Sequence, residues 1–217
     1  ASPMRSNQVD RLWAINGGSD LPKLGKFVTD LRSKGVEKVS IRYHEDFWRA
    51  DGESYTFRTI PNPDLGIERL KEYVRFVQGQ DWRIGFYSNY MDFAPVNALW
   101  NEDWVRISDK DYGWGPAWRR CYANKVTIGW EQQAILAPQI HKTFGTNFSY
   151  CDVETCISPM DRVDYDYRTP GAGKFRTVFE YIGMTLMNER RAYQGPVYSE
   201  GGTHWFYAGL LDGNYSH

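Results

Sequence analysis

Phe148-Ser149-Tyr150-Cys151-Asp152-Val153 is the stretch that decides the fold, because a short aromatic and apolar run ends there beside a carboxylate. Its length and composition are typical of a buried β-strand. Four further runs of this character are predicted as strands: residues 11–16, 37–44, 82–88 and 196–200. The chain therefore shows five predicted strands of one kind.

Helical patterns lie between these strands. Apolar residues recur on one helical face in residues 21–31, again in residues 70–77, and again in residues 175–186. A weaker pattern predicts a fourth helix over residues 128–143. Strands that alternate with helices predict a parallel sheet with crossover helices, which is an α/β fold.

The polar residues at the predicted strand ends favour a (β/α)8 barrel of the TIM type, whose active sites lie at the carboxyl ends of the strands. A doubly wound sheet would gather such residues in the same way, but no G-x-G-x-x-G follows the first strand. A closed barrel usually takes about 250 residues. The five βα units visible here therefore predict an incomplete barrel over residues 1–217, either one catalytic domain that is incompletely built or a fragment of a longer enzyme.

Charge and composition exclude several classes of function. The net charge is −1 and no run of Lys or Arg occurs, so we expect no binding to nucleic acid. No apolar stretch approaches the roughly 18 residues of a membrane span, so we expect no membrane insertion. Aromatic residues make up 16% of the chain, which suits either a carbohydrate site or a Trp-rich core.

Two carboxylates end neighbouring predicted strands. A period of two places Tyr150, Asp152 and Glu154 on one side of their strand, pointing into the barrel mouth. Glu200 ends the next strand, and Gly201-Gly202 lets the chain turn sharply beside it. Glycoside hydrolysis requires two carboxyl groups, so Asp152 and Glu200 are the predicted catalytic pair. The alternatives are an Asp that caps the following loop and a Glu paired with Arg42 or Arg120.

Polar and aromatic residues near the predicted strand ends complete a candidate sugar site. The long connection over residues 89–122 carries Trp100, Trp104, Trp114 and Trp118, and its length and aromatic density predict a wall of the site. The expected substrate-binding residues are His44, Asp46, Asn89, Asp92, Trp118, Tyr122, Lys125, Glu154, His204, Trp205 and Tyr207. For Lys125, a solvated position at a helix start is an equal alternative, and Glu154 competes with Asp152 and Glu200 for a catalytic role.

Four segments resemble bacterial proteins related to endo-α-N-acetylgalactosaminidases: residues 42–46, 90–93, 150–153 and 198–202. The resemblance spans about residues 10–215. It implies a TIM barrel and a retaining mechanism, with an Asp nucleophile at the fourth strand and a Glu acid/base on a following strand. Carried over, Asp152 matches the nucleophile and Glu200 the acid/base. The expected partner is a carbohydrate, either an oligosaccharide or the glycan of a glycoconjugate, and the expected location is secreted or periplasmic.

Two functions of other classes remain open at this point. A non-catalytic carbohydrate-binding barrel protein would keep the aromatic residues without needing paired carboxylates. A metal-dependent hydrolase would use His44, Asp46 and His204, although these residues lack ligand spacing. The three cysteines, Cys121, Cys151 and Cys156, have no C-x-x-C spacing and predict neither zinc nor a complete set of disulfides. We expect no metal and no cofactor.

Overall fold

The computed structural model describes Met4, residues 10–44, Trp48 and residues 56–215. A parallel sheet has the strand order β1-β2-β3-β6-β7-β8, so each strand lies beside its predecessor in this sheet. The strands are β1 (Leu12–Asn16), β2 (Val39–Tyr43), β3 (Arg83–Ser88), β6 (Ser149–Cys151), β7 (Val197–Glu200) and β8 (Gly213–Tyr215). A doubly wound sheet would reverse its order at a switch point, and this one does not.

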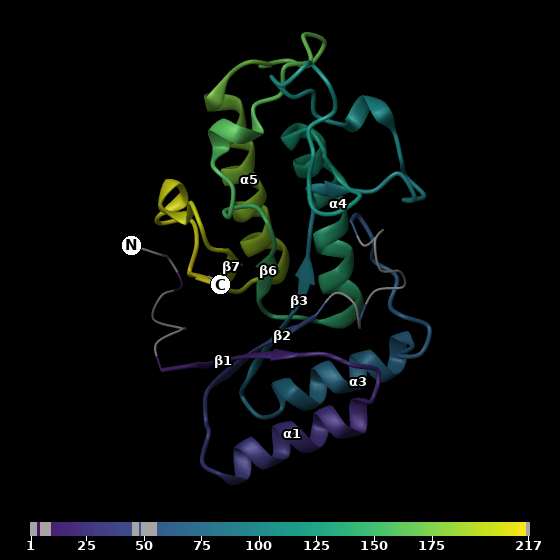
Figure 1. The fold of residues 1–217 in the computed structure, drawn as a ribbon. Helices are drawn as coiled ribbons and strands as arrows, with labels where there is room; N and C mark the ends of the chain where they lie inside the picture. The colour runs from purple at the N-terminus through teal and green to yellow at the C-terminus, as the bar shows by residue number, and fades with distance from the viewer. Residues whose placement is uncertain (1–3, 5–9, 45–47, 49–55, 216–217) are drawn as a thin grey trace.

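The helices form a row along the outer face of the sheet. They are α1 (Leu21–Ser33), α3 (Ile67–Gln78), α4 (Val126–Phe144) and α5 (Phe175–Tyr193), and α3 packs on α1 and α4 while α4 packs on α5. In Figure 1 the strand direction turns from β1, which runs from side to side, to β3, which points up the picture. The sheet is therefore curled, as in part of a barrel.

Alternation along the strands separates two faces. On β2, Val39, Ile41 and Tyr43 are fully buried in a core shared with α1 and α3. The inner face carries rings instead, in a cluster of Trp13, Tyr87, Phe148, Tyr150, Tyr198 and Tyr215. The amphipathic helices thus cover one face, and the aromatic cluster fills the concave side of the sheet.

The five predicted strands and four helices are confirmed with small changes in their ends. The weak pattern over residues 128–143 corresponds to α4. Its apolar residues are not confined to one face, because the helix contacts both α3 and α5. Strand β8 is absent from the prediction because a three-residue segment with Gly and Asn has low strand propensity. β8 can lie this close to β7 only with glycine at residue 213, since a Cβ there would lie 2.2 Å from the ring of Tyr198.

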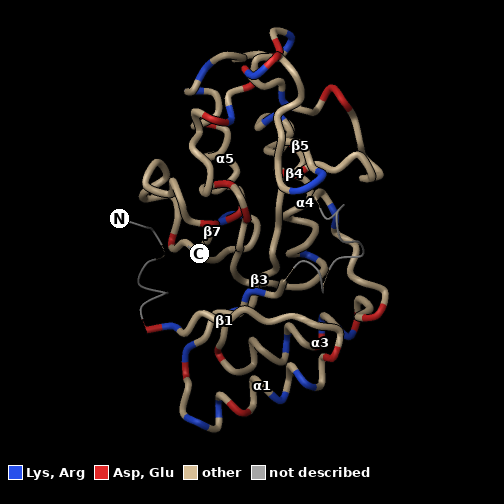
Figure 2. Tube along the Cα trace, viewed as in Figure 1, with Lys and Arg blue, Asp and Glu red and all other residues tan. Residues whose placement is uncertain are grey.

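The long connection after β3 has structure of its own. β4 (Asp92–Phe93) pairs antiparallel with β5 (Tyr122–Ala123), and a 3-10 helix spans Glu102–Trp104. Two further 3-10 helices, Pro159–Arg162 and His204–Tyr207, follow β6 and β7. Lys, Arg, Asp and Glu are interspersed along α1, α3 and these loops (Figure 2). Among the described residues, no helix is both long and apolar enough to cross a bilayer.

Candidate active site

Asp152 and Glu200 occupy matching positions at the carboxyl ends of neighbouring strands. Cys151 of β6 is in register with Ser199 of β7, so Asp152 follows one partner and Glu200 follows the other. Neighbouring residues in a parallel sheet point to the same side. Because Tyr150 and Tyr198 belong to the inner cluster, Asp152 and Glu200 also face the concave side, and both are partly exposed there.

Two tyrosines hold the carboxylate of Asp152. The hydroxyl of Tyr87 donates to Oδ2 at 2.5 Å, and the hydroxyl of Tyr150 donates to Oδ1 at 2.9 Å. The backbone N–H of Asp152 donates to the carbonyl of Ser88 at 2.7 Å. Hydrogen bonds to a carboxylate stabilise its charged form and limit its rotation. Sequence reasoning missed Tyr87, although a period of two along β3 places it on the same face as Asn89.

Arg42 lies beneath these tyrosines on the inner face of β2. Its guanidinium carbon is 4.4 Å from the ring centroid of Tyr150, 5.2 Å from that of Tyr215 and 5.7 Å from that of Tyr87. Burial raises the pKa of the Tyr150 hydroxyl well above its usual range, the charge of Asp152 adds to this, and Arg42 opposes it. Arg42 is therefore a buried positive charge next to the ring that holds Asp152.

The loops that follow β6 and β7 are joined to one another. Thr155 donates from Oγ1 to the carbonyl of Glu200 at 2.6 Å, and the backbone N–H of Thr203 donates to the carbonyl of Thr155 at 2.8 Å. A Cβ at Gly202 would lie 2.4 Å from the carbonyl oxygen of Cys156, so glycine permits this approach. The two segments that carry the candidate carboxylates are thus held at a defined spacing.

Glu154 does not share the face of Asp152, so the predicted extension of the strand period is wrong. β6 ends at Cys151, and Val153 has a φ of 59°, which breaks the alternation. The carboxylate of Glu154 is 2% exposed and lies 3.8 Å from Sγ of Cys151. Burial raises the pKa of Glu154 to about 7, which Arg162 opposes and Glu189 reinforces. A buried carboxyl in this position does not face the barrel mouth.

Asn89 and Asp92 are linked to Asp152 through Tyr87. Asn89 is fully buried and donates to Oδ2 of Asp92 at 3.0 Å and to the hydroxyl of Tyr87 at 3.4 Å. Burial raises the pKa of Asp92, a shift that the hydrogen bond from Asn89 opposes. A chain of contacts therefore runs from Asp152 through Tyr87 and Asn89 to Asp92.

Several other predicted binding residues have a partner within the protein. Lys125 is buried, and its Nζ lies 2.7 Å from Oδ2 of Asp166. Tyr207 is 1% exposed, and its ring stacks on Phe179 of α5 at 5.4 Å. Tyr122 is half-buried among the rings of Trp100 and Trp114. Lys125 and Tyr207 thus contribute to packing. The sequence did not predict this, because position in the chain alone does not show which way a loop side chain turns.

The other described residues of the predicted set, His44, Trp118, His204 and Trp205, are at least partly exposed. His44 is half-buried, with its ring 5.8 Å from that of Tyr87. Trp118 and Trp205 are 61% and 60% exposed, and His204 is adjacent to Trp205 at a ring distance of 5.8 Å. Asp46 lies outside the described residues. Within the described part of the chain, no three His, Cys, Asp or Glu side chains gather in a way that could hold a metal ion.

The aromatic residues of the long connection divide into two groups. Trp100 and Trp104 are packed with Phe93, Phe57 and Tyr90 in a small core of their own. Trp118 is exposed and stands beneath the guanidinium of Arg119. Both readings of the aromatic excess are therefore represented, a Trp-rich core for the first group and accessible ring surface for Trp118.

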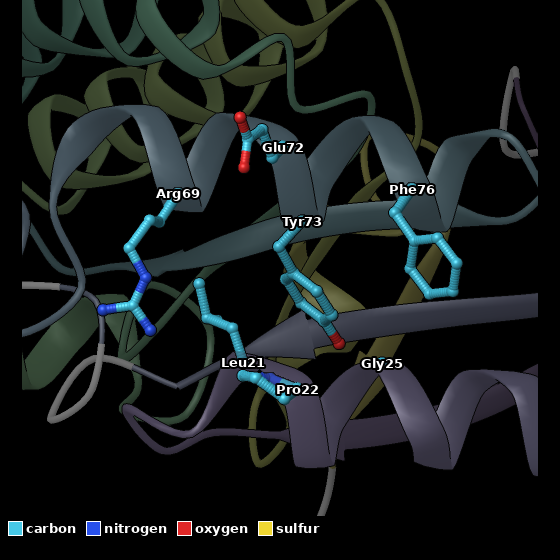
Figure 3. A pocket seen from close by; sticks show the side chains of 7 residues that line it. All are labelled: Leu21, Pro22, Gly25, Arg69, Glu72, Tyr73 and Phe76. Atoms are coloured by element: carbon cyan, nitrogen blue, oxygen red, sulfur yellow. The ribbon is translucent and has the colours of Figure 1, made fainter.

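Two of the cavities among the described residues have linings that do not include Asp152 or Glu200. One, of about 330 Å³, lies between α1 and α3 and is bordered by Leu21, Tyr73, Phe76 and Arg69 (Figure 3). The other, of about 310 Å³, lies between the loops after β3 and β6 and includes Asp92 in its lining. The second borders Asp92, which Asn89 and Tyr87 connect to Asp152.

Solved structures share this fold. The α-N-acetylgalactosaminidase of Bifidobacterium bifidum, in complex with GalNAc, matches with a TM-score of 0.80 at 14% identity, covering 100% of this chain and 38% of that one. An α-galactosidase of Geobacillus stearothermophilus matches with a TM-score of 0.70 at 12% identity, covering 99% and 32%. An α-galactosidase of Thermus thermophilus, in complex with stachyose, matches with a TM-score of 0.63 at 15% identity, covering 94% and 42%.

These matches establish a glycoside hydrolase-like α/β fold with a curled parallel sheet. The chain spans about two fifths or less of each of these structures. No protein-family model matches the sequence. No curated protein matches it either.

Proposed function

We propose that this chain carries the catalytic pair of a retaining glycoside hydrolase, with Asp152 as nucleophile and Glu200 as acid/base. The observation that carries the proposal is the register of β6 and β7, which sets both carboxylates side by side on the inner face. Neighbouring strands lie about 4.8 Å apart. Retaining enzymes need carboxyl groups about 5–5.5 Å apart, whereas inverting enzymes need about 6.5–9.5 Å.

The environment of each carboxylate suits its proposed role. Asp152 accepts from two phenolic hydroxyls, which favours the ionised form that attacks the anomeric carbon. Glu200 is partly exposed at the end of β7, where a leaving oxygen could reach it. In the first step it protonates the leaving oxygen as Asp152 forms the glycosyl ester, and in the second it takes a proton from water, which releases the sugar.

The substrate is proposed to be the glycan of an oligosaccharide or glycoconjugate. Exposed rings at Trp118 and Trp205, near the strand ends, offer surfaces on which a sugar could stack. The matched structures include enzymes named for α-linked galactose and N-acetylgalactosamine, so aryl α-glycosides of these two sugars are the first substrates to test. We further propose a secreted or periplasmic bacterial location, where such glycans are met.

The test is turnover of these aryl glycosides by the full-length protein and its Asp152→Asn and Glu200→Gln variants. We expect each variant to lose about 10³-fold or more in kcat, as removal of a catalytic group does elsewhere. Glu102→Gln, an exposed carboxylate on the long loop, is the matched control and should retain activity. Azide should rescue Asp152→Asn and give a glycosyl azide of inverted configuration. Full activity in both variants would reject the pair, whereas no turnover by the wild-type protein would leave a carbohydrate-binding role.

A further inference from the structure

The cavity of about 310 Å³ beside Asp92 has walls from two separate loops. One wall comes from the connection after β3 and includes Arg106, Pro116 and Ala117, and the other comes from the loop after β6 and includes Met160 and Arg162. Both loops leave the carboxyl ends of strands, where barrel enzymes bind their ligands. The volume is at the lower end of the range for small-ligand sites, about 300–1,000 Å³.

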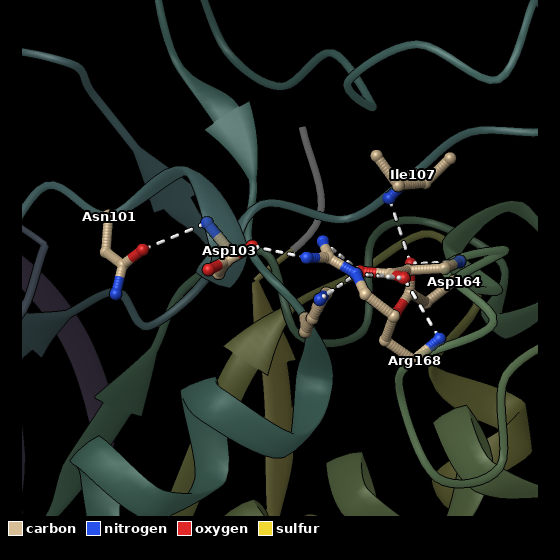
Figure 4. A network of polar contacts seen from close by, with 7 residues as sticks. Asn101, Asp103, Ile107, Asp164 and Arg168 are labelled. Carbon is tan, nitrogen blue, oxygen red and sulfur yellow. Dashed lines mark hydrogen bonds and ion pairs between the residues drawn. The ribbon is translucent and has the colours of Figure 1, made fainter.

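The two walls are held together by polar contacts. Arg168 forms ion pairs of 2.9 Å with Asp103 on one loop and with Asp166 on the other. The backbone N–H of Ile107 donates to Oδ1 of Asp164 at 2.9 Å (Figure 4). The backbone N–H of Tyr165 donates to the carbonyl of Ile107 at 3.0 Å. The cavity is therefore a preformed space rather than a gap between independent loops.

Three buried charged groups line the cavity. Asp92 is 6% exposed, Arg106 6% and Arg162 4%, and burial of charge is unfavourable unless the group is fully hydrogen-bonded. Arg106 donates one Nη1 hydrogen to the carbonyl of Val163 at 3.1 Å, and Arg162 donates from Nη2 to the carbonyl of Val153. Among the described residues, Nε of both arginines and Nη1 of Arg162 have no partner. Guanidinium donors are thus gathered here beyond those that the loops themselves use.

Close packing holds Arg106 against the cavity. A Cβ at Gly115 would lie 2.4 Å from Nη2 of Arg106, so glycine at residue 115 leaves room for the guanidinium in this position. Burial lowers the pKa of Arg106, and the charge of Arg162 acts in the same direction. A ligand oxygen that accepts hydrogen bonds from Arg106 would stabilise the charged form of its guanidinium.

The rim of the cavity is apolar and accessible. Met160, Ile157 and Tyr165 line it and are 62%, 42% and 39% exposed. The charges in the lining of the whole cavity cancel: Asp92, Asp109 and Asp161 are negative, and Arg106, Lys110 and Arg162 are positive. An anion would meet three acids and a cation three bases. An uncharged ring with several hydroxyls fits this mixture, because its hydroxyls both donate and accept while its C–H face packs on apolar side chains.

We propose that this cavity is a second sugar-binding site, which takes a neutral pyranose ring. Its role as a further subsite for an oligosaccharide substrate rests on the proposed function, since the contacts through Asn89 and Tyr87 connect Asp92 to the candidate nucleophile. The binding itself does not depend on catalysis.

The methionines provide a site-specific readout. Of the five in the chain, Met91 and Met160 line the cavity, whereas Met184 and Met187 lie on α5. The experiment adds galactose, N-acetylgalactosamine or lactose to full-length protein labelled at its methionine methyl groups with ¹³C, and follows the NMR signals. We expect the signals of Met91 and Met160 to shift with one common Kd, and those of Met184 and Met187 to stay in place.

Two variants and one matched control test the location. Ala117→Trp fills the cavity and Tyr165→Ala removes an exposed apolar wall, so each should weaken binding by about 10-fold or more. Ala98→Trp, exposed on the same long loop outside this cavity, should bind as the wild type does. Unchanged binding in both cavity variants would overturn the proposal. So would shifts produced only by N-acetylneuraminic acid or sulfate, or no shift at all with the neutral sugars.

The proposed function and this inference can fail separately. Asp152→Asn should abolish turnover and leave the shifts of Met91 and Met160 intact. A wild-type protein that cleaves no glycoside yet shows these shifts would contradict only the proposed function. Turnover without any shift at Met160 would contradict only the second site.

Discussion

Tyr87 and Asp152 are joined by a hydrogen bond of 2.5 Å, although 65 residues separate them in the chain. The strand order brings β3 and β6 together, and the register of Ser88 with Cys151 sets the phenol beside the carboxylate. Asp152 is thus oriented by the neighbouring strand as well as by its own.

Removal of the Tyr87 hydroxyl should weaken the proposed nucleophile. In Tyr87→Phe the ring remains, but the carboxylate of Asp152 loses a donor that stabilises its charged form. We expect kcat/KM to fall by about 10-fold to 100-fold, with the acidic limb of the pH–rate profile moving to higher pH. Tyr43→Phe is the control, because its hydroxyl donates to the carbonyl of Gly18 at 2.6 Å, away from Asp152. The same pH shift in both variants would contradict a specific role for Tyr87.

The bond from Thr155 to Glu200 should affect turnover more than stability. Thr155→Val keeps the shape and loses the hydrogen bond, which is worth about 1 kcal/mol in stability. We expect kcat to fall by about 10-fold with little change in KM, and Thr155→Ser to restore it. Thr177→Val loses a similar bond, of 2.8 Å to Gly171, and should lose stability alone. Equal kcat values in the two valine variants would show that Thr155 is only structural.

Glu154 should make the protein less stable as pH rises. Its pKa is raised to about 7 from 4.5, so the folded state holds a proton that the unfolded state has released between these values. Stability from this group is therefore present below about pH 4.5 and lost as pH rises through 7, by about 3 kcal/mol in total. Glu154→Gln should match the wild type at pH 5 and exceed it at pH 8 in urea unfolding.

The control for Glu154 is the exposed Glu131 of α4. Glu131→Gln should leave the difference in unfolding free energy between pH 5 and pH 8 unchanged. If Glu154→Gln retained the full wild-type pH dependence, Asp92 or another buried group would have to account for it.

Lys125 should stabilise the fold rather than bind substrate. Its amino group is buried against Asp166, which Arg168 also contacts. We expect Lys125→Met to reduce the free energy of unfolding by about 1–3 kcal/mol, because Asp166 then loses a charged partner. Lys26→Met removes an exposed pair with Asp30 and should cost less than about 1 kcal/mol. A rise in KM for Lys125→Met at unchanged stability would favour the predicted substrate contact instead.

The sequence by itself determined the α/β class and most of the element positions. Apolar periodicity follows from which face of a helix or strand is buried, so α1, α3 and α5 and the first five sheet strands could be predicted from local residues. The same alternation oriented Asp152 inward, because one strand end is a local property. Charge balance and strand-end chemistry likewise pointed to a carbohydrate rather than a nucleic acid.

Only the tertiary structure decided how residues distant in the chain meet. It brought Tyr87 and Arg42 to Asp152, turned Glu154 away at the positive φ of Val153, and paired Lys125 with Asp166. It also added β8, whose three residues form a strand only because β7 offers an unpaired edge. Such contacts depend on strand register and on loop packing, which local propensity does not specify.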